Sequence, residues 1–144
     1  MTRLDLNFAA LIIAQALHSV EEYVGRLWAV FPPAAFISGL ISEDHRLGFI
    51  IFNIALLAFG VWCFFWPVWR RWPHMGGFVA FWVLIEIING VGHPLWTLRQ
   101  GGYTPGVITA PLLLVLALLL IRRYLLHAHR PNQRMQRTAP RSDA

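Results

Sequence analysis

Four apolar segments of about 20 residues each dominate the sequence, at about residues 8–31, 47–68, 76–96 and 104–122. A helix of roughly 20 residues crosses the ~30 Å hydrocarbon core of a bilayer, and inside lipid the backbone must satisfy its own hydrogen bonds. The chain is 57% hydrophobic and 13% charged, against roughly 25% charged in soluble proteins. The sequence therefore predicts an all-α fold, an integral membrane bundle of four transmembrane helices.

The length of the chain suits one domain rather than two. We expect residues 1–125 to form the transmembrane domain and residues 126–144, which are polar and basic, to form a disordered tail. No small-residue cleavage site accompanies the first apolar segment, so this segment should remain in the mature chain. The single cysteine, Cys63, excludes an intramolecular disulfide and a cysteine-based metal knuckle.

Charge predicts the orientation of the bundle. All 12 basic residues are arginines, and the net charge is +5. With four spans, the N-terminus, the loop with Arg70 and Arg71 and the C-terminal tail share one side. On the other side, Glu43 and Asp44 offset Arg46. Because positive loops face the cytoplasm, we expect both termini there, in the inner (plasma) membrane, next to anionic lipid. No basic face interleaved with aromatic residues predicts nucleic-acid binding.

The first segment carries ionisable side chains where a membrane helix should be hydrocarbon, namely His18, Glu21 and Glu22. Each such group costs roughly 2.5–3.5 kcal/mol on insertion scales, so it indicates a functional site by default. Since a helix turns by about 100° per residue, Glu21 lies about 60° to one side of His18 and Glu22 about 40° to the other. The three side chains therefore share one face of the helix.

The third segment carries a second polar stripe, with Glu86, Asn89 and His93 on one narrow helix face. In a four-span topology the first and third segments run in the same direction, and the two stripes lie at similar depth. Pro94 should kink or break the helix beside His93. We therefore expect the two stripes to form a single site.

Imidazole and carboxylate groups are ligands for Zn²⁺ and Fe²⁺. The metal ligands that we expect are His18, Glu22 and His93. The charge of the metal would also offset the cost of burying the carboxylates. The general base would then be Glu21 or Glu86. Without a metal, a carboxylate beside a histidine could still act as an acid–base pair.

Asn89 could bind an oxyanion or orient a ligand. Two plainer interpretations stay open. The polar stripe of the first segment could be a structural network that joins helices, and Glu86 could simply pair with Arg26 or His18. Arg26 could also extend its charge to the outer membrane interface.

Three motifs, in order along residues 18–106, resemble those of the HXXEE-domain family of small bacterial membrane proteins. His18-x-x-Glu21-Glu22 matches HxxEE, Asn89-Gly-Val-Gly-His93 matches NxxxH, and Tyr103-Thr104-Pro105-Gly106 matches YxPG. The resemblance implies an integral membrane protein and an enzyme, but it supplies no substrate. It also implies a site role for Tyr103, which otherwise suits a tight turn at the membrane interface.

The run from Glu21 to Arg26 is also similar to the EExxxR motif of CAAX-processing intramembrane glutamate proteases. The other motifs of that family, FxxxH and HxxxN or HxxxD, are absent in that form, since Asn89 and His93 stand in the reverse order. We take this similarity as a chemical analogy.

We expect a membrane enzyme that performs metal-assisted hydrolysis of a lipid or another hydrophobic substrate, with a divalent metal (Zn or Fe) on His18, Glu22 and His93. In this interpretation Asn89 and Tyr103 orient the substrate. The alternative is a proton- or ion-coupled membrane transporter or sensor that uses the same Glu–His cluster as a proton relay. Four helices are few for a carrier, so this alternative requires a dimer.

Overall fold

The computed structural model describes the backbone of residues 1–138 and the side chains as far as Ala128; within this range it contains helices and no strand. In chain order the elements are α1 (Arg3–Val24), α2 (Leu27–Val30), α3 (Pro32–Ile41), α4 (His45–Cys63), the π-helical turn η1 (Phe64–Val68), α5 (Met75–Gln100) and α6 (Ala110–Thr138). The prediction of an all-α fold is confirmed for these residues.

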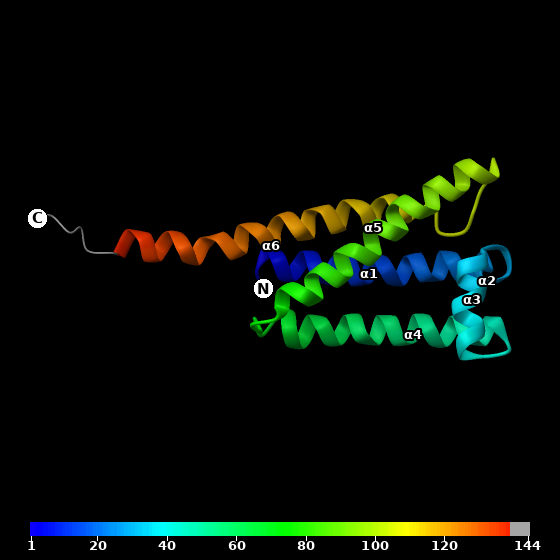
Figure 1. Cartoon of the computed structure of the whole chain (residues 1–144), viewed down its shortest axis with the longest axis horizontal. Helices are drawn as coiled ribbons and strands as arrows, with labels where there is room; N and C mark the ends of the chain where they lie inside the picture. The colour runs from blue at the N-terminus through cyan, green and yellow to red at the C-terminus, as the bar shows by residue number, and fades with distance from the viewer. Residues whose placement is uncertain (139–144) are drawn as a thin grey trace, which may run out of the picture.

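The long helices α1, α4, α5 and α6 form an elongated bundle (Figure 1). α1, α4 and α6 lie lengthwise, and α5 crosses them obliquely from one end of the bundle to the other. The short helices α2 and α3 lie at the far end, where they connect α1 to α4. α1 and α5 therefore run in the same direction, and the N-terminus lies at the end of the bundle toward which α6 runs.

In the described part of the chain three helical stretches, not the predicted four, are long and apolar enough to cross a membrane: His45–Val68, Met75–Gln100 and Ala110–Ala128. The first predicted segment, residues 8–31, is interrupted after Val24. α1 is long enough but too polar. It contains six polar side chains that are buried in the bundle: Asp5, Asn7, Gln15, His18, Ser19 and Glu22. It turns these groups toward its neighbours and leaves Ile13 exposed on its outer face.

α1 begins and ends with well-defined contacts. At its start the Thr2 amide donates to Oδ2 of Asp5 at 2.7 Å, and the Asp5 amide donates to the Thr2 hydroxyl at 3.4 Å, which makes a capping box. At its end a Cβ on Gly25 would lie 2.5 Å from Pro105. The loop before α6 therefore packs directly on the end of α1, which brings residues far apart in sequence into one site.

An apolar core lies between the first halves of α1 and α5 and the middle of α6, and its members include Phe8, Leu11, Val79, Trp82 and Leu120. The outer faces of the spans are also apolar, since only 22%, 33% and 22% of their most hydrophobic windows are buried. A continuous apolar exterior of this kind is unfavourable in water and suits lipid. The structure is thus compatible with a membrane protein.

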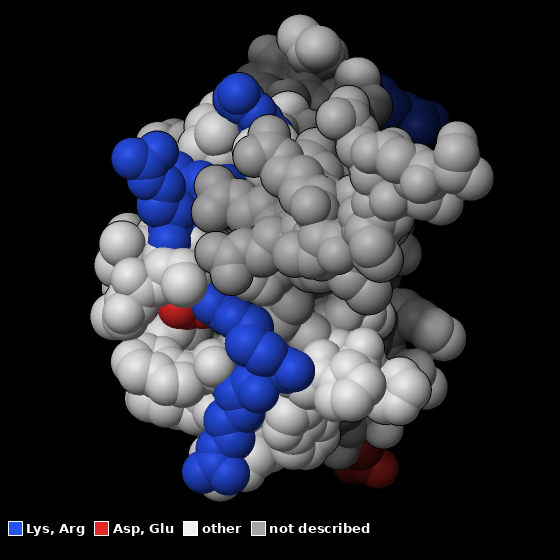
Figure 2. All heavy atoms as spheres, turned by 90° about the vertical axis from the view of Figure 1, so that its left-hand side faces the viewer, with Lys and Arg blue, Asp and Glu red and all other residues white. Residues whose placement is uncertain are grey.

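Arginine side chains gather on the end of the bundle that carries the N-terminus (Figure 2). Two of them help to close this end, because Arg71 pairs with Asp5 at 2.7 Å and Arg123 donates to the Arg3 carbonyl at 2.7 Å. The positively charged segments that were predicted to share one side therefore lie at one end of the molecule, as far as the described residues extend.

The predicted tail, residues 126–144, begins inside α6. The backbone is helical to Thr138, and the last part of the tail, residues 139–144, lies outside the described residues. The domain boundary after residue 125 stays a prediction.

Candidate functional site

The two adjacent carboxylates of α1 turn toward different partners. Oε1 of Glu21 accepts hydrogen bonds from the Tyr103 hydroxyl at 3.1 Å and from the amides of Gly106 and Ile108 at 3.0 Å. Its Oε2 accepts from the amide and the hydroxyl of Thr109, at 2.9 and 2.6 Å. A carboxylate here satisfies amides that the start of a helix leaves unpaired. Glu21 thus fastens the loop before α6 to the end of α1.

Tyr103 lies at the surface of this loop, with 62% of its area exposed. Partial burial, followed by the hydrogen bond and the charge of Glu21, raises the pKa of Tyr103. The phenol therefore keeps its proton and acts as a donor toward Glu21. Tyr103 also lines a pocket of about 320 Å³, together with Trp96 and Pro105.

Glu22 turns into the bundle and meets two histidines. Its Oε1 lies 3.3 Å from Nε2 of His18, one turn earlier on α1, and 3.1 Å from Nε2 of His93 on α5. The two imidazole rings are 4.8 Å apart and nearly perpendicular, at 84°. All three side chains are buried, and one ligand atom from each lies within 4.8 Å of the others. This group could hold a metal ion.

The loop before α6 closes over this group at Gly106. Its φ of +92° is a conformation that residues with a Cβ rarely adopt. A Cβ there would lie 2.6 Å from Cε1 and Nδ1 of His93 and 2.9 Å from Cε1 of His18. Glycine therefore lets the backbone pack on both imidazoles. This contact joins the YxPG motif to the HxxEE and NxxxH motifs in space.

Thr109 decides which nitrogen of His18 carries a hydrogen. Its hydroxyl lies 2.6 Å from Oε2 of Glu21 and 2.7 Å from Nδ1 of His18. A hydroxyl has one hydrogen, and an ionised carboxylate can only accept, so Thr109 donates to Glu21 and accepts from Nδ1–H of His18. In the neutral imidazole the other nitrogen then bears a lone pair. Nε2 of His18 thus directs a lone pair toward Glu22.

Two buried imidazole nitrogens, Nε2 of His18 and Nδ1 of His93, make no hydrogen bond to a described residue. The 3.3 Å between Nε2 of His18 and Glu22 is an ion-pair distance, but in the tautomer that Thr109 selects both atoms are acceptors. Two acceptors held this close repel each other unless a proton or a cation lies between them. The geometry therefore favours a positive charge between His18 and Glu22.

Glu86 lies on α5 two turns before His93 and is completely buried. When the Gln15 amide nitrogen faces Glu86, it donates to the two carboxylate oxygens at 3.1 and 3.2 Å. We assign this orientation because the opposite one sets the amide oxygen against a carboxylate. Asn89 donates to Oε2 of Glu86 at 3.4 Å. No ion pair joins Glu86 to Arg26 within residues 1–128.

α4 joins this polar layer through Asn53. The Ser19 hydroxyl donates to Oδ1 of Asn53 at 2.7 Å, and the Asn53 amide donates to the Phe49 carbonyl at 3.0 Å. Ser19 and Gln15 of α1 are therefore paired across the bundle, toward α4 and α5. This pairing explains how α1 can be both polar and buried.

The predicted site residues fall into three neighbouring sets: His18, Glu22 and His93; Glu21 and Tyr103; and Glu86 and Asn89. The sequence did not single out Thr109, which contacts both Glu21 and His18. Its signal was its position, because a threonine directly before an apolar helix is a typical N-cap.

The model of a family described as "Protein of unknown function with HXXEE motif" matches residues 9–121 of the chain. The matched range contains all three motifs and every residue of the site, and it confirms the resemblance seen in the sequence. Comparisons with curated proteins and with solved structures find no match.

Proposed function

Because this chain belongs to the family of proteins of unknown function with the HXXEE motif, we propose its function from the site itself. The protein is a membrane enzyme that hydrolyses a lipid or another hydrophobic substrate with the help of a divalent metal, Zn²⁺ or Fe²⁺. The observation that carries this proposal is the contact of 2.7 Å between the Thr109 hydroxyl and Nδ1 of His18, which leaves Nε2 of His18 to direct a lone pair toward Glu22.

The donor atoms of His18, Glu22 and His93 fit such a metal. Ligand distances of about 2.0–2.2 Å place tetrahedral ligands roughly 3.3–3.6 Å apart. Oε1 of Glu22 lies 3.3 Å from Nε2 of His18 and 3.1 Å from Nε2 of His93, at and just below this range. Two histidines and one carboxylate are the ligand set of catalytic zinc and non-haem iron sites. Three protein ligands leave a coordination position open, which supports a catalytic rather than a structural metal.

The groups around these ligands support the same role. Hydrogen bonds link His18 to Thr109 and Thr109 to Glu21. Hydrogen bonds of this kind orient metal-bound histidines in other proteins. Glu21 accepts five hydrogen bonds that fasten the loop, whereas Glu86, among the described residues, accepts hydrogen bonds only from the side chains of Gln15 and Asn89, so we assign the general-base role to Glu86. Glu86 lies on α5, the helix that also carries His93.

When bound, the metal would polarise the reacting bond of the substrate and make a water molecule more acidic. The chain itself positions the reactants. The pocket beside Tyr103 offers a hydrophobic group access next to the loop, and the Tyr103 hydroxyl is a donor at its edge. Glu86 takes up a proton inside the polar layer, and Asn89 steadies its carboxylate. Gly106 packs on the histidines and keeps bulk water from them.

Metal analysis of the purified full-length protein tests the site. After chelation and reloading with Zn²⁺ or Fe²⁺, the wild type should hold about one ion per chain, and His18→Ala and Glu22→Gln should hold none. His74→Ala, which changes a histidine in the turn before α5, is the matched control and should keep the ion. A wild type that takes up neither metal contradicts the proposal.

Turnover tests the hydrolytic role separately. Glu86→Gln should keep the metal and lose release of fatty acid from lipid in proteoliposomes, because it removes only the proton acceptor. Equal turnover by Glu86→Gln and the wild type would remove Glu86 from the mechanism.

A second candidate is proton- or ion-coupled transport. The observation that favours it is the layer of buried polar groups that links Gln15, Glu86 and Asn89 between α1 and α5. Proton flux into proteoliposomes should then survive chelation and disappear in Glu86→Gln, while Glu43→Gln in the exposed loop leaves it unchanged. The absence of flux in the wild type would contradict transport.

We also propose that both termini face the cytoplasm and that the protein lies in the inner (plasma) membrane. The arginines at the end of the bundle with the N-terminus support this orientation. A fluorescent protein fused to the C-terminus should then fluoresce, and a phosphatase that is active only outside the cytoplasm should stay inactive in the same position. The reverse pattern would contradict the orientation.

A further inference from the structure

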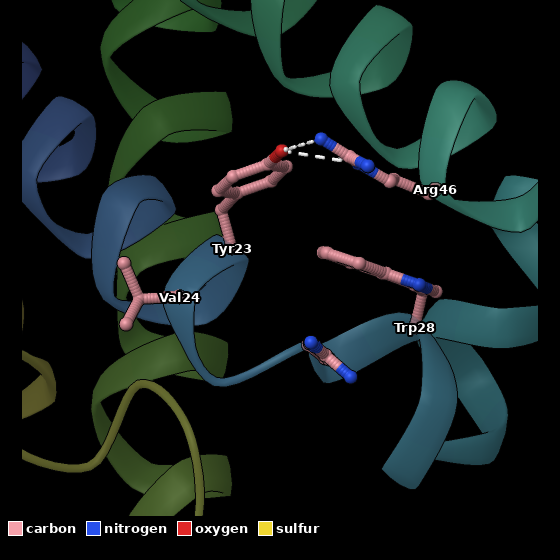
Figure 3. Close-up of a pocket in the computed structure, with 5 residues that line it drawn as sticks. Tyr23, Val24, Trp28 and Arg46 are labelled. Carbon is pink, nitrogen blue, oxygen red and sulfur yellow. Dashed lines mark hydrogen bonds between the residues drawn. The ribbon is translucent and has the colours of Figure 1, made fainter.

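A separate polar pocket lies just beyond the end of α1. It has a volume of about 490 Å³ and is lined by Tyr23, Val24, Arg26, Trp28 and Arg46. Figure 3 shows Tyr23 of α1 joined to Arg46 of α4, with Trp28 of α2 below them. Three helix ends thus meet around a space that two guanidinium groups border.

Tyr23 holds Arg46 in place without neutralising it. Nε and Nη2 of Arg46 donate to the Tyr23 hydroxyl at 3.1 and 2.7 Å, and the guanidinium carbon lies 5.7 Å from the ring centre. The nearby carboxylate of Asp44 accepts instead from the Arg46 and Leu47 amides, as the N-cap of α4. Within residues 1–128 no carboxylate forms an ion pair with Arg46, which leaves Nη1 available to a ligand.

Arg26 is held in an unusual backbone conformation. Its φ of 54° and ψ of 50° are left-handed, a region where glycine is favoured over residues with a Cβ. The other positive-φ residue apart from glycine in the described chain, Arg71, is paired with Asp5. The backbone of Arg26 is hydrogen-bonded to Tyr23 and Ala29, but its guanidinium makes no hydrogen bond or ion pair with a described residue. A strained and unpaired cation beside a pocket indicates a ligand-binding role.

Aromatic rings form the apolar wall of the pocket. Trp28 lies 5.3 Å from the Tyr23 ring and 5.1 Å from the Phe49 ring, so it is fixed on both sides. Amphipathic rings of this type are common at the depth of lipid headgroups. The pocket also lies at the end of the bundle, where α1 ends and α4 begins.

We propose that this pocket binds a phosphate-type anion, either a lipid headgroup or free phosphate. Each guanidinium can offer a phosphate two parallel N–H bonds, and Arg26 and Arg46 together balance its charge. An acyl chain next to the phosphate could lie along the apolar side of Trp28. This site does not depend on the metal proposed above, because it shares no ligand with the His18–Glu22–His93 group.

Calorimetric titration of the full-length protein in an uncharged detergent tests the proposal. One arm uses inorganic phosphate, a second uses dihexanoyl phosphatidic acid, and dihexanoyl glycerol controls for the acyl chains. Arg46→Gln and Arg26→Asn, the latter chosen because asparagine tolerates a left-handed backbone, should each raise Kd about tenfold or more. Arg99→Gln, an exposed arginine at the end of α5, should bind as the wild type does.

The outcomes separate the two sources and can refute both. Much tighter binding of phosphatidic acid than of phosphate identifies a headgroup site, and equal binding identifies a site for free phosphate. Arg26→Gly adds a decisive comparison, because it should raise Tm by relieving strain and still lose the anion. The proposal fails if neither probe binds the wild type, if Arg26→Gly keeps full affinity, or if Arg99→Gln weakens binding equally.

Discussion

Replacement of Glu21 by glutamine exchanges one carboxylate oxygen for an amide nitrogen and keeps the shape of the side chain. One oxygen can still serve the three donors at Oε1, but the new NH₂ group faces the amide and the hydroxyl of Thr109. Two hydrogen bonds to a charged group are lost, each worth about 1.5–3 kcal/mol. Water reaches the half-buried side chain and compensates for a part of the lost hydrogen-bond energy. We therefore expect Glu21→Gln to lower the free energy of unfolding by about 2–4 kcal/mol.

Glu22→Gln is the matched control, because it makes the same substitution on the neighbouring residue. Thermal unfolding of the metal-free protein in detergent should show a fall in Tm on the order of 5–15 °C for Glu21→Gln and an equal or higher Tm for Glu22→Gln. Metal binding should show the reverse order, because Glu22→Gln removes a ligand and abolishes binding, whereas Glu21→Gln only disturbs the hydrogen bonds that orient His18 and weakens it. If Glu21→Gln unfolds at the wild-type temperature, the idea that Glu21 fastens the loop to α1 is refuted.

Three further substitutions test the packing and the hydrogen bonds of the loop. Gly106→Ala should lower Tm and metal affinity together, because the new Cβ would lie 2.6 Å from atoms of His93. Thermal unfolding and metal titration measure the two quantities, and unchanged values would contradict the packing of Gly106 on His93. Thr109→Val should weaken metal binding by about 10–100-fold, because it removes the hydroxyl that orients His18, and Thr109→Ser should restore it in a competition titration. Tyr103→Phe removes one exposed hydrogen bond and should lower the free energy of unfolding by less than about 1 kcal/mol, as measured in denaturant. A larger loss would show that the Tyr103 hydroxyl has stabilising contacts besides its hydrogen bond to Glu21.

Helical spacing was enough to predict the centre of the site. His18 and Glu22 are four residues apart, so they lie on one face of any helix that contains them both. His93 could be added because the third segment carries its own polar stripe and runs in the same direction as the first. In the structure, one ligand atom from each of these three side chains lies within 4.8 Å of the other two.

The role of Glu21 in fastening the loop could not be predicted in this way, although helical spacing paired its neighbour Glu22 with the histidines. The two residues have the same chemistry and are adjacent, and a helix turns by about 100° between them. Which segment meets the carboxylate of Glu21 depends on where the loop before α6 returns. That return depends on contacts more than 80 residues apart in sequence, such as those of Gly106 and Thr109 with Glu21.

The first segment shows the same limit. Its length and its apolar residues predicted a transmembrane helix, yet it is less apolar than the three helices that could cross a membrane and stops at Gly25. Its polar side chains are acceptable in the bundle because Glu86 and Asn53 on other helices pair with them. No local pattern reveals such partners.

The sequence by itself determined the helical class, the apolar exterior, the family and the three side chains that face one another, because these follow from composition, motif and helical period. The tertiary structure alone decided that Glu21 fastens the loop before α6 to the end of α1, and that Thr109 orients His18. The physical reason is that hydrogen bonds act over about 3 Å, so the role of a polar side chain depends on which distant segment the fold brings next to it.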